Sequence, residues 1–267
     1  MRDSRAANDP PLSDIILPDF PLFTYLLRLA DDRLVLGHRL SEWCGHGPIL
    51  EEDIALANIA LDLIGEATLC YKLAGEVEAT GRSEDTLAYF RDAVDYRNAL
   101  MLELPNGDFA FTIVRQFFFS VYSLLQMTAL QKSTNQDLAG IAAKATKEAK
   151  YHVRHCAQWV ATLGDGTDES HRRAQSAVDE LWRYTGELFL ADDIDREIAA
   201  AGLGVDPSTL ADAWRSQVDD VLQRATLTTP SVAYMQRGGR DGKHTEHLGH
   251  LLTEMQIVAR SHPGAAW

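Results

Sequence analysis

The sequence is poor in cysteine and has no excess of positive charge. Its 267 residues include only three cysteines, Cys44, Cys70 and Cys156. So small, odd and dispersed a set excludes a disulfide framework, and we expect reduced thiols in a cytoplasmic protein, with Cys70 and Cys156 packed as small hydrophobic side chains. The formal net charge of -14 argues against binding to nucleic acid or to an anionic membrane, because both require cationic patches.

Long apolar runs are missing as well. We find no stretch of about 18 apolar residues, so we predict no membrane-spanning helix. Residues 1–18 are polar, contain proline and lack the apolar centre of a signal peptide, so we expect a flexible N-terminal tail. No linker divides the remainder, and residues 19–267 are predicted to form a single domain.

The alternating pattern of β-strands is also absent, and helical periodicity dominates the chain. Long helices joined by short turns make antiparallel neighbours, so the sequence predicts an all-α bundle with additional helices. The expected helices cover residues 20–43, 49–74, 86–104, 109–132, 136–163, 168–191, 207–225 and 245–260.

The predicted helix 49–74 is apolar around almost its whole circumference, which indicates a central position in the bundle. Its middle contains only two charged residues, Asp62 and Glu66. A carboxylate in such surroundings has to be paired, protonated or bound to a cation. A metal-ligand role is one interpretation of Asp62. We favour a polar contact with a neighbouring helix, or an ion pair with Arg28 or Arg33.

Glu148 and His152 lie four residues apart on the apolar stripe of the predicted helix 136–163, so their side chains share one face. Di-iron carboxylate bundles use Glu-x-x-His, a spacing of three, once on each of two helices. The corresponding place on the earlier apolar helix reads Asp62-Leu63-Ile64-Gly65, without histidine. We therefore interpret Asp62, Glu148 and His152 as vestigial, ligand-like positions. We assign neither a metal site nor a catalytic residue, and we expect a hydrogen bond between Glu148 and His152.

The predicted helix 109–132 supports this interpretation by what it lacks. It contains no Asp or Glu, although a di-iron site would need a carboxylate from this helix. Its middle reads Phe117-Phe118-Phe119-Ser120, which would fill a metal cavity with aromatic rings. This is the strongest argument from the residues against di-iron chemistry.

Further acidic residues on the first helix are candidates for a first metal ligand. Asp31 or Asp32 lies where such a ligand of a ferritin-like bundle would fall, and His38 and Glu42 follow on the same helix. Adjacent residues point to different helix faces, so at most one of the two aspartates faces inward. A solvated helix face accounts for both, and this is the interpretation we favour.

The C-terminal region contains the densest group of histidines. The spacing of His247 and His250 resembles a zinc site only weakly, because His-x-x-His is common by chance, and we expect a helix start capped near Thr245. The preceding loop, Arg237–Lys243, has three glycines and three cations. A phosphate or an acidic partner is one interpretation, and a mobile surface loop is the one we favour.

Cys44 follows the first helix in Trp43-Cys44-Gly45-His46 and invites a catalytic-thiol interpretation. The negative end of the helix dipole disfavours a thiolate there, so we reject that interpretation.

Several segments resemble the C component of bacterial phenylacetyl-CoA 1,2-epoxidases. The resemblance covers essentially everything after the N-terminal tail, and segments of this length are specific. It is carried by Ala30–His46, Ala55–Gly65, Pro105–Ala110, Lys147–His152 and Gly238–Met255, the last including His244-Thr245-Glu246-His247-Leu248-Gly249.

The resemblance implies a ferritin-like fold and a place in a multicomponent monooxygenase. Such a complex epoxidises the ring of phenylacetyl-CoA in aerobic phenylacetate degradation, with O2 and electrons from NADPH. In that family the di-iron centre belongs to the related catalytic A component, whereas the C component lacks a complete ligand set and supports its relative structurally. For this chain the resemblance implies no cofactor of its own. The expected partners are the catalytic A component and other epoxidase components, in homo- and hetero-oligomers.

Two other functions stay open at this stage. One is an independent di-iron or di-manganese carboxylate oxidase that uses Asp31 or Asp32 with Asp62, Glu148 and His152. The other is a CoA-binding module, for which the loop Arg237–Lys243 is the best sequence hint.

Overall fold

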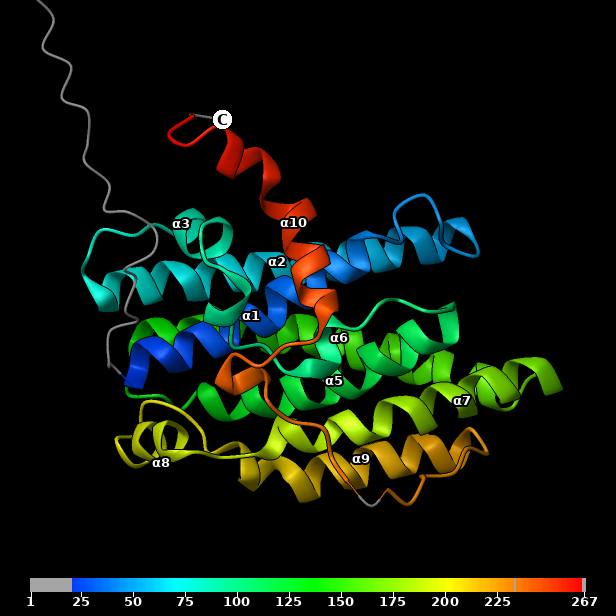
Figure 1. The fold of residues 1–267 in the computed structure, drawn as a ribbon. Helices are drawn as coiled ribbons and strands as arrows, with labels where there is room; N and C mark the ends of the chain where they lie inside the picture. The colour runs from blue at the N-terminus through cyan, green and yellow to red at the C-terminus, as the bar shows by residue number, and fades with distance from the viewer. Residues whose placement is uncertain (1–20, 233, 266–267) are drawn as a thin grey trace, which may run out of the picture.

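A computed structural model describes residues 21–232 and 234–265; the predicted tail at residues 1–18 lies outside them. Four long helices form the bundle: α1 (Pro21–Ser41), α2 (Leu50–Glu78), α5 (Phe109–Leu130) and α6 (Gln136–Gly164). α1 packs along α2, α5 packs along α6, and contacts between α2 and α6 join the two pairs (Figure 1). Every regular element in the described ranges is helical, which confirms the predicted all-α, ferritin-like bundle.

Additional helices enclose this bundle. α7 (Asp168–Thr185) and α9 (Ala211–Arg224) pack against α5 and α6. α10 (Glu246–Ser261) crosses α1, and its C-terminal end projects past α2 and α3 (Figure 1). The shorter elements are α3 (Glu84–Tyr89), η2 (Ala93–Asp95), α4 (Leu100–Glu103), η3 (Gly186–Phe189), α8 (Asp193–Ala200), η4 (Pro207–Leu210) and η5 (Gly239–Asp241).

Polar side chains cap the starts of several of these helices. Asp108 accepts a hydrogen bond from the N–H of Phe111 at 2.9 Å, and Asn135 accepts one from Leu138 at 2.9 Å. Thr245 is the N-cap of α10, as the sequence predicts. Each cap satisfies a backbone donor that has no partner within the helix.

The predicted helix 86–104 is wrong, because this segment is broken into α3, η2 and α4. The reason lies on α1. Asp31 accepts a hydrogen bond from the N–H of Arg97 at 2.7 Å, and Asp32 accepts one from Ala99 at 2.8 Å. A continuous helix would use these N–H groups internally, so the two carboxylates compete with helix formation. The helix predicted at 168–191 likewise ends at Thr185, and α8 follows it without having been predicted.

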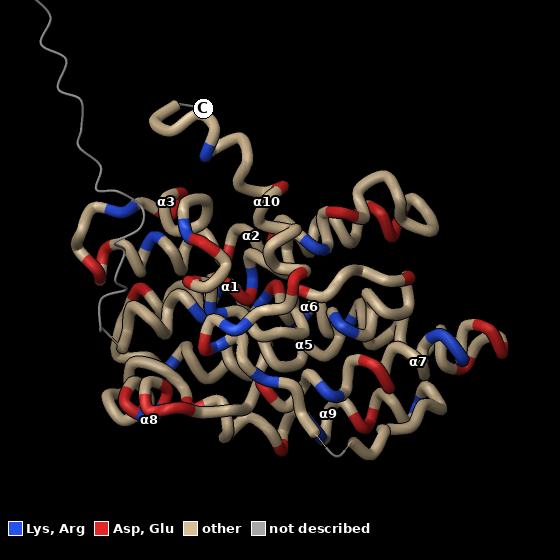
Figure 2. The backbone as a smooth tube through the Cα atoms, in the orientation of Figure 1, with Lys and Arg blue, Asp and Glu red and all other residues tan. Residues whose placement is uncertain are grey.

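The core lies between α5 and its neighbours. Phe117, Phe118 and Phe119 are fully buried. The ring of Phe118 lies 5.6 Å from both Trp182 of α7 and Trp214 of α9, edge to face. Burial of these rings holds the outer helices to the bundle. Acidic residues gather outside this core, on α8 and at the N-terminal end of α2 (Figure 2).

The helix α2 is less central than predicted. It packs on α1 and α6, yet Leu61 on its opposite face is 67% exposed. Within the described residues it is the one helix long and apolar enough to cross a membrane by length and composition, and 50% of its most apolar stretch is buried in the fold. Helices of bundles that pack on two neighbours, as α2 does, meet the same criterion.

Candidate functional site: the polar centre of the bundle

Asp62 and His152 connect α2 to α6. His152 Nε2 lies 3.0 Å from Asp62 Oδ2. The histidine is almost fully buried, whereas the Asp62 side chain is 36% exposed. The predicted contact of Asp62 with a neighbouring helix is confirmed. The alternative ion pair with Arg28 or Arg33 is wrong, because both arginines bind other carboxylates.

Glu148 does not bind His152, so the predicted hydrogen bond between them is wrong. Its Oε1 lies 3.2 Å from Lys144 Nζ, one turn earlier on α6. Its Oε2 is buried, and no described residue donates a hydrogen bond to it. Burial raises the pKa of Glu148, and the pairing with Lys144 opposes that shift. Glu148 and His152 share a helix face, but each reaches a different partner.

A buried guanidinium occupies the middle of the bundle. Arg33 of α1 donates from Nε to Glu66 Oε2 of α2 at 2.6 Å. From its terminal nitrogen it donates to Ser123 at 3.1 Å and Gln126 at 3.4 Å, both on α5. The Arg33 side chain is 0% exposed. Burial lowers the pKa of Arg33, but the attraction and hydrogen bond to Glu66, together with the attraction to Cys70 and Asp32, outweigh that effect and the net shift is upward. A permanent cation therefore joins three helices.

The donor set of this centre does not fit a di-iron site. Between residues 21 and 265, residue 233 apart, no group of three or more His, Cys, Asp or Glu side chains is placed to hold a metal ion. Glu66, which is 2% exposed, accepts a hydrogen bond from Arg33. α5 contributes a hydroxyl, an amide and aromatic rings in place of a carboxylate. The fixed guanidinium of Arg33 repels metal cations, and its hydrogen bond to Glu66 occupies a carboxylate lone pair that a metal ion would need.

Asp31 and Asp32 are both buried, at 0% and 1% exposure, so the predicted solvated face is wrong. Asp31 binds the guanidinium of Arg91 and the hydroxyl of Tyr71. Asp32 accepts two hydrogen bonds from Arg240, at 2.8 and 2.7 Å. Different segments of the chain, which carry Arg91 and Arg240, cover α1 on two sides. The side chains of Asp31 and Asp32 are therefore both enclosed, although they point to different faces of the helix. Their lone pairs are used by protein donors, which leaves neither as a ligand.

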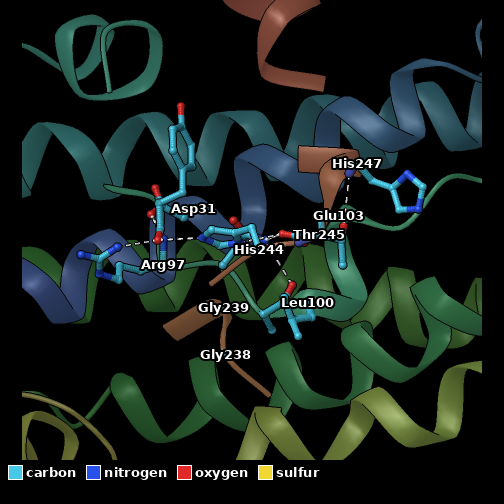
Figure 3. Close-up of polar contacts among 12 residues, drawn as sticks. Asp31, Arg97, Leu100, Glu103, Gly238, Gly239, His244, Thr245 and His247 are labelled. Atoms are coloured by element: carbon cyan, nitrogen blue, oxygen red, sulfur yellow. Dashed lines mark hydrogen bonds and ion pairs between the residues drawn. The ribbon is translucent and has the colours of Figure 1, made fainter. Parts of the chain in front are cut away.

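Two glutamates, Glu187 of η3 and Glu103 of α4, hold residues 238–245 of the C-terminal loop in place. Glu187 accepts hydrogen bonds from the N–H groups of Gly238, at 2.7 Å, and Gly239, at 2.8 Å. Glu103 of α4 accepts from the Thr245 N–H at 2.6 Å and lies 2.8 Å from His244 Nδ1 (Figure 3). The predicted mobile loop Arg237–Lys243 is therefore wrong, because its backbone is anchored at several points.

Glycine is required at position 239 of this loop. A Cβ atom there would lie 2.0 Å from the carbonyl oxygen of Asn98. Gly238 has a φ of 142°, which other residues rarely adopt. The glycines are the signal in the sequence that this segment approaches another backbone closely. No pattern in the sequence marks its buried partners Glu103 and Glu187, or Arg91, the buried partner of Asp31.

The loop offers little to a phosphate group. Arg240 is committed to Asp32, which leaves Arg237 and Lys243 exposed. They line a cavity of about 560 Å³ together with Asp192, Asp195 and Asp241. Arg28 also lines this cavity, but it is paired with Asp192 and Asp195, and Asp241 opposes the binding of an anion.

The remaining candidates have structural explanations. The N–H of His247 donates to the Thr245 hydroxyl at 3.3 Å, in the first turn of α10, and His250 is exposed. Cys70 and Cys156 are fully buried, as predicted, and burial raises the pKa of Cys70 to about 12. Cys44 is exposed in a turn.

Comparison with known proteins places the chain in a family. The family described as phenylacetic acid catabolic protein matches residues 17–267. This chain belongs to that family. It is 48% identical over 246 residues to the C component of 1,2-phenylacetyl-CoA epoxidase from Escherichia coli K12, a match that covers 92% of this chain and 99% of the relative. The resemblance in the sequence segments is thereby confirmed.

Proposed function

We propose that the chain is a non-catalytic structural subunit of a phenylacetyl-CoA epoxidase, which supports the di-iron catalytic A component in the cytoplasm. The similarity to the C component from Escherichia coli supports membership in such a complex. The Arg33–Glu66 pair is the observation that carries the non-catalytic role, because it puts a fixed cation where a bundle of this type would bind metal.

The role in the complex is tested by expressing the catalytic component by itself and together with this chain. We expect it to be soluble and active only in the co-expressed sample, because obligate partners bury extended apolar surface and aggregate without it. Recovery of an equally soluble and active catalytic component without this chain would contradict the proposal.

The metal-free role is tested on the purified chain. After incubation with Fe(II) or Mn(II) and removal of excess ion, we expect no stoichiometric metal. The rival di-iron or di-manganese oxidase requires about two ions per chain, lost in a Glu148→Ala variant. An Arg33→Glu variant is the informative counterpart, since it replaces the repelling cation by a carboxylate. A rise in metal binding in this variant alone would support the role we give to Arg33.

A further inference from the structure

One buried guanidinium lacks an acidic partner. The buried arginines that the structure describes are Arg28, Arg33, Arg39, Arg91 and Arg115. The first four each form an ion pair with an aspartate or a glutamate, whereas no described carboxylate pairs with Arg115. Burial and repulsion from Arg39 lower the pKa of Arg115 to about 9, although Glu42 attracts it. A buried charge without a counter-charge is costly, so a carboxylate beside Arg115 would stabilise the fold.

The side chain of Asn106 stands where such a carboxylate would lie. One terminal nitrogen of Arg115 donates to Asn106 Oδ1, and the other donates to the carbonyl oxygen of Leu104. Arg115 Nε is buried, and no described residue accepts a hydrogen bond from it. An aspartate at position 106 would offer this guanidinium two charged acceptors in place of one neutral acceptor, and charge-assisted pairs are the stronger ones.

The sequence at this place favours the conversion of Asn106 into aspartate. Asn106-Gly107 is the only Asn-Gly pair in the 267 residues. The backbone nitrogen after an asparagine can attack the side-chain carbonyl carbon, and glycine hinders this attack least because it has no Cβ. Gly107 is exposed and has a φ of 59°. The pair therefore lies in a turn that water reaches.

The reaction needs only water as a co-reactant. The Gly107 nitrogen bonds to Cγ of Asn106 and loses its proton, and the bond from Cγ to Nδ2 breaks, so that ammonia leaves. Water then opens the succinimide ring, which yields aspartate when it adds at Cγ and isoaspartate when it adds at the main-chain carbonyl carbon. Negative charge develops on Oδ1 during the first attack, and Arg115 already donates a hydrogen bond to that oxygen.

We propose that Asn106 is a deamidation site of the folded chain, where Arg115 promotes the reaction and pairs with the carboxylate that forms. Because the reaction needs no second protein, it does not depend on the proposed function.

Two hydrogen bonds of the amide oppose the reaction. Asn106 Nδ2 donates to the carbonyl oxygen of Arg39 at 2.6 Å and to Glu42 Oε2 at 3.0 Å. The Glu42 side chain is 41% exposed and can turn into solvent, whereas Arg115 is fully buried and stays in place. Pairing a buried cation is worth more than two hydrogen bonds at a partly solvated position, so the balance favours the carboxylate.

The experiment follows the folded full-length chain in mildly alkaline buffer. Mass spectrometry of tryptic peptides, sampled over time, gives the fraction of aspartate and isoaspartate at position 106. Asn135 is the matched internal control, because it is also half-buried at the start of a helix but is followed by Gln136. A sample kept unfolded in urea gives the rate for the chain without its tertiary contacts.

We expect position 106 to convert in the folded chain at least as fast as in urea, while Asn135 converts far more slowly. A lower rate at position 106 in the folded chain than in urea would overturn the proposal, because the fold would then protect the amide.

Two variants test the part played by Arg115. Arg115→Met removes the cation and should slow the conversion in the folded chain several-fold; an unchanged rate would show that Arg115 does not promote it. Should this variant fail to fold, Asn106→Asp keeps the proposal testable, since it carries the product from the start. We expect its melting temperature to equal or exceed that of the unchanged chain. A lower melting temperature would show that Glu42 and the Arg39 carbonyl repel the carboxylate more than Arg115 attracts it, and would refute the pairing.

Discussion

Carboxylates on the two sides of the bundle are treated very differently. Beside α1, Asp31, Asp32 and Glu187 are buried and each accepts hydrogen bonds from at least two distant groups. At the α2/α6 seam, Asp62 has one partner among the described residues, and Glu148 keeps a buried oxygen without any.

The difference shows what each set of charges does. Taking a carboxylate out of water is costly unless its lone pairs are satisfied. The carboxylates beside α1 meet this condition by accepting hydrogen bonds from the backbone N–H groups of residues 97, 99 and 100 and of residues 238 and 239. These charges therefore fix the path of both segments. The seam stays partly solvated, and its charges connect two helices that apolar packing already holds together.

Breaking a buried pair on the α1 side should have the largest effect. Asp31→Asn keeps the volume but leaves the guanidinium of Arg91 buried without its counter-charge. We expect the free energy of unfolding in urea to fall by about 3–5 kcal/mol. A loss below roughly 1 kcal/mol would show that the buried pair between Asp31 and Arg91 stabilises the fold no more than a surface ion pair does.

The close approach of the C-terminal loop can be tested at a single glycine. In Gly239→Ala the new methyl group would meet the Asn98 carbonyl oxygen, so the loop has to shift away from Glu187. We expect a loss of about 1–3 kcal/mol. Gly140→Ala on α6 is the matched control, because its Cβ meets nothing within 4 Å.

The control should be stabilised by about 0.5–1 kcal/mol, because alanine favours a helix over glycine. Similar destabilisation of both variants in thermal unfolding would contradict the structural account of position 239.

His244 makes the α1 side sensitive to pH. Burial lowers its pKa, but the hydrogen bond and attraction to Glu103 and the bond to the Tyr96 carbonyl outweigh burial, and the net shift is upward. The folded chain therefore binds this proton more tightly than the unfolded chain. The stabilisation is complete below the ordinary histidine pKa of about 6.5 and is lost as pH rises through the higher folded value.

We therefore expect the unfolding free energy of the unchanged chain, minus that of His244→Gln, to decrease from about pH 6.5 upward. Urea titrations at several pH values measure this difference. A difference that stays constant, or that grows with pH, would show that His244 is not held as a cation.

The smallest effect should come from the seam. Asp62→Asn removes a charge whose side chain is 36% exposed and whose partner can still accept or donate a hydrogen bond. We expect a change within about 1 kcal/mol. Destabilisation comparable to that of Asp31→Asn would remove the contrast between the two sides.

The sequence predicted the helices wherever their own residues decide them. The 3.6-residue periodicity located α1, α2, α5 and α6, because amphipathic pattern and caps act within one helix. It failed at residues 86–104, where Asp31 and Asp32 capture backbone N–H groups more than 60 residues away. It also failed for Glu148 and His152, whose shared face says nothing about which partners face them.

By itself, the sequence determined an all-α bundle, and it predicted the lack of a complete set of metal ligands. Periodicity and residue type are local properties, and they can be counted along the chain. Only the tertiary structure decided that Arg33 fills the centre, that both aspartates of α1 are buried, and that one side of α2 is left uncovered. Each of these depends on which distant segments pack against a helix, and ion pairs and burial arise only from that packing.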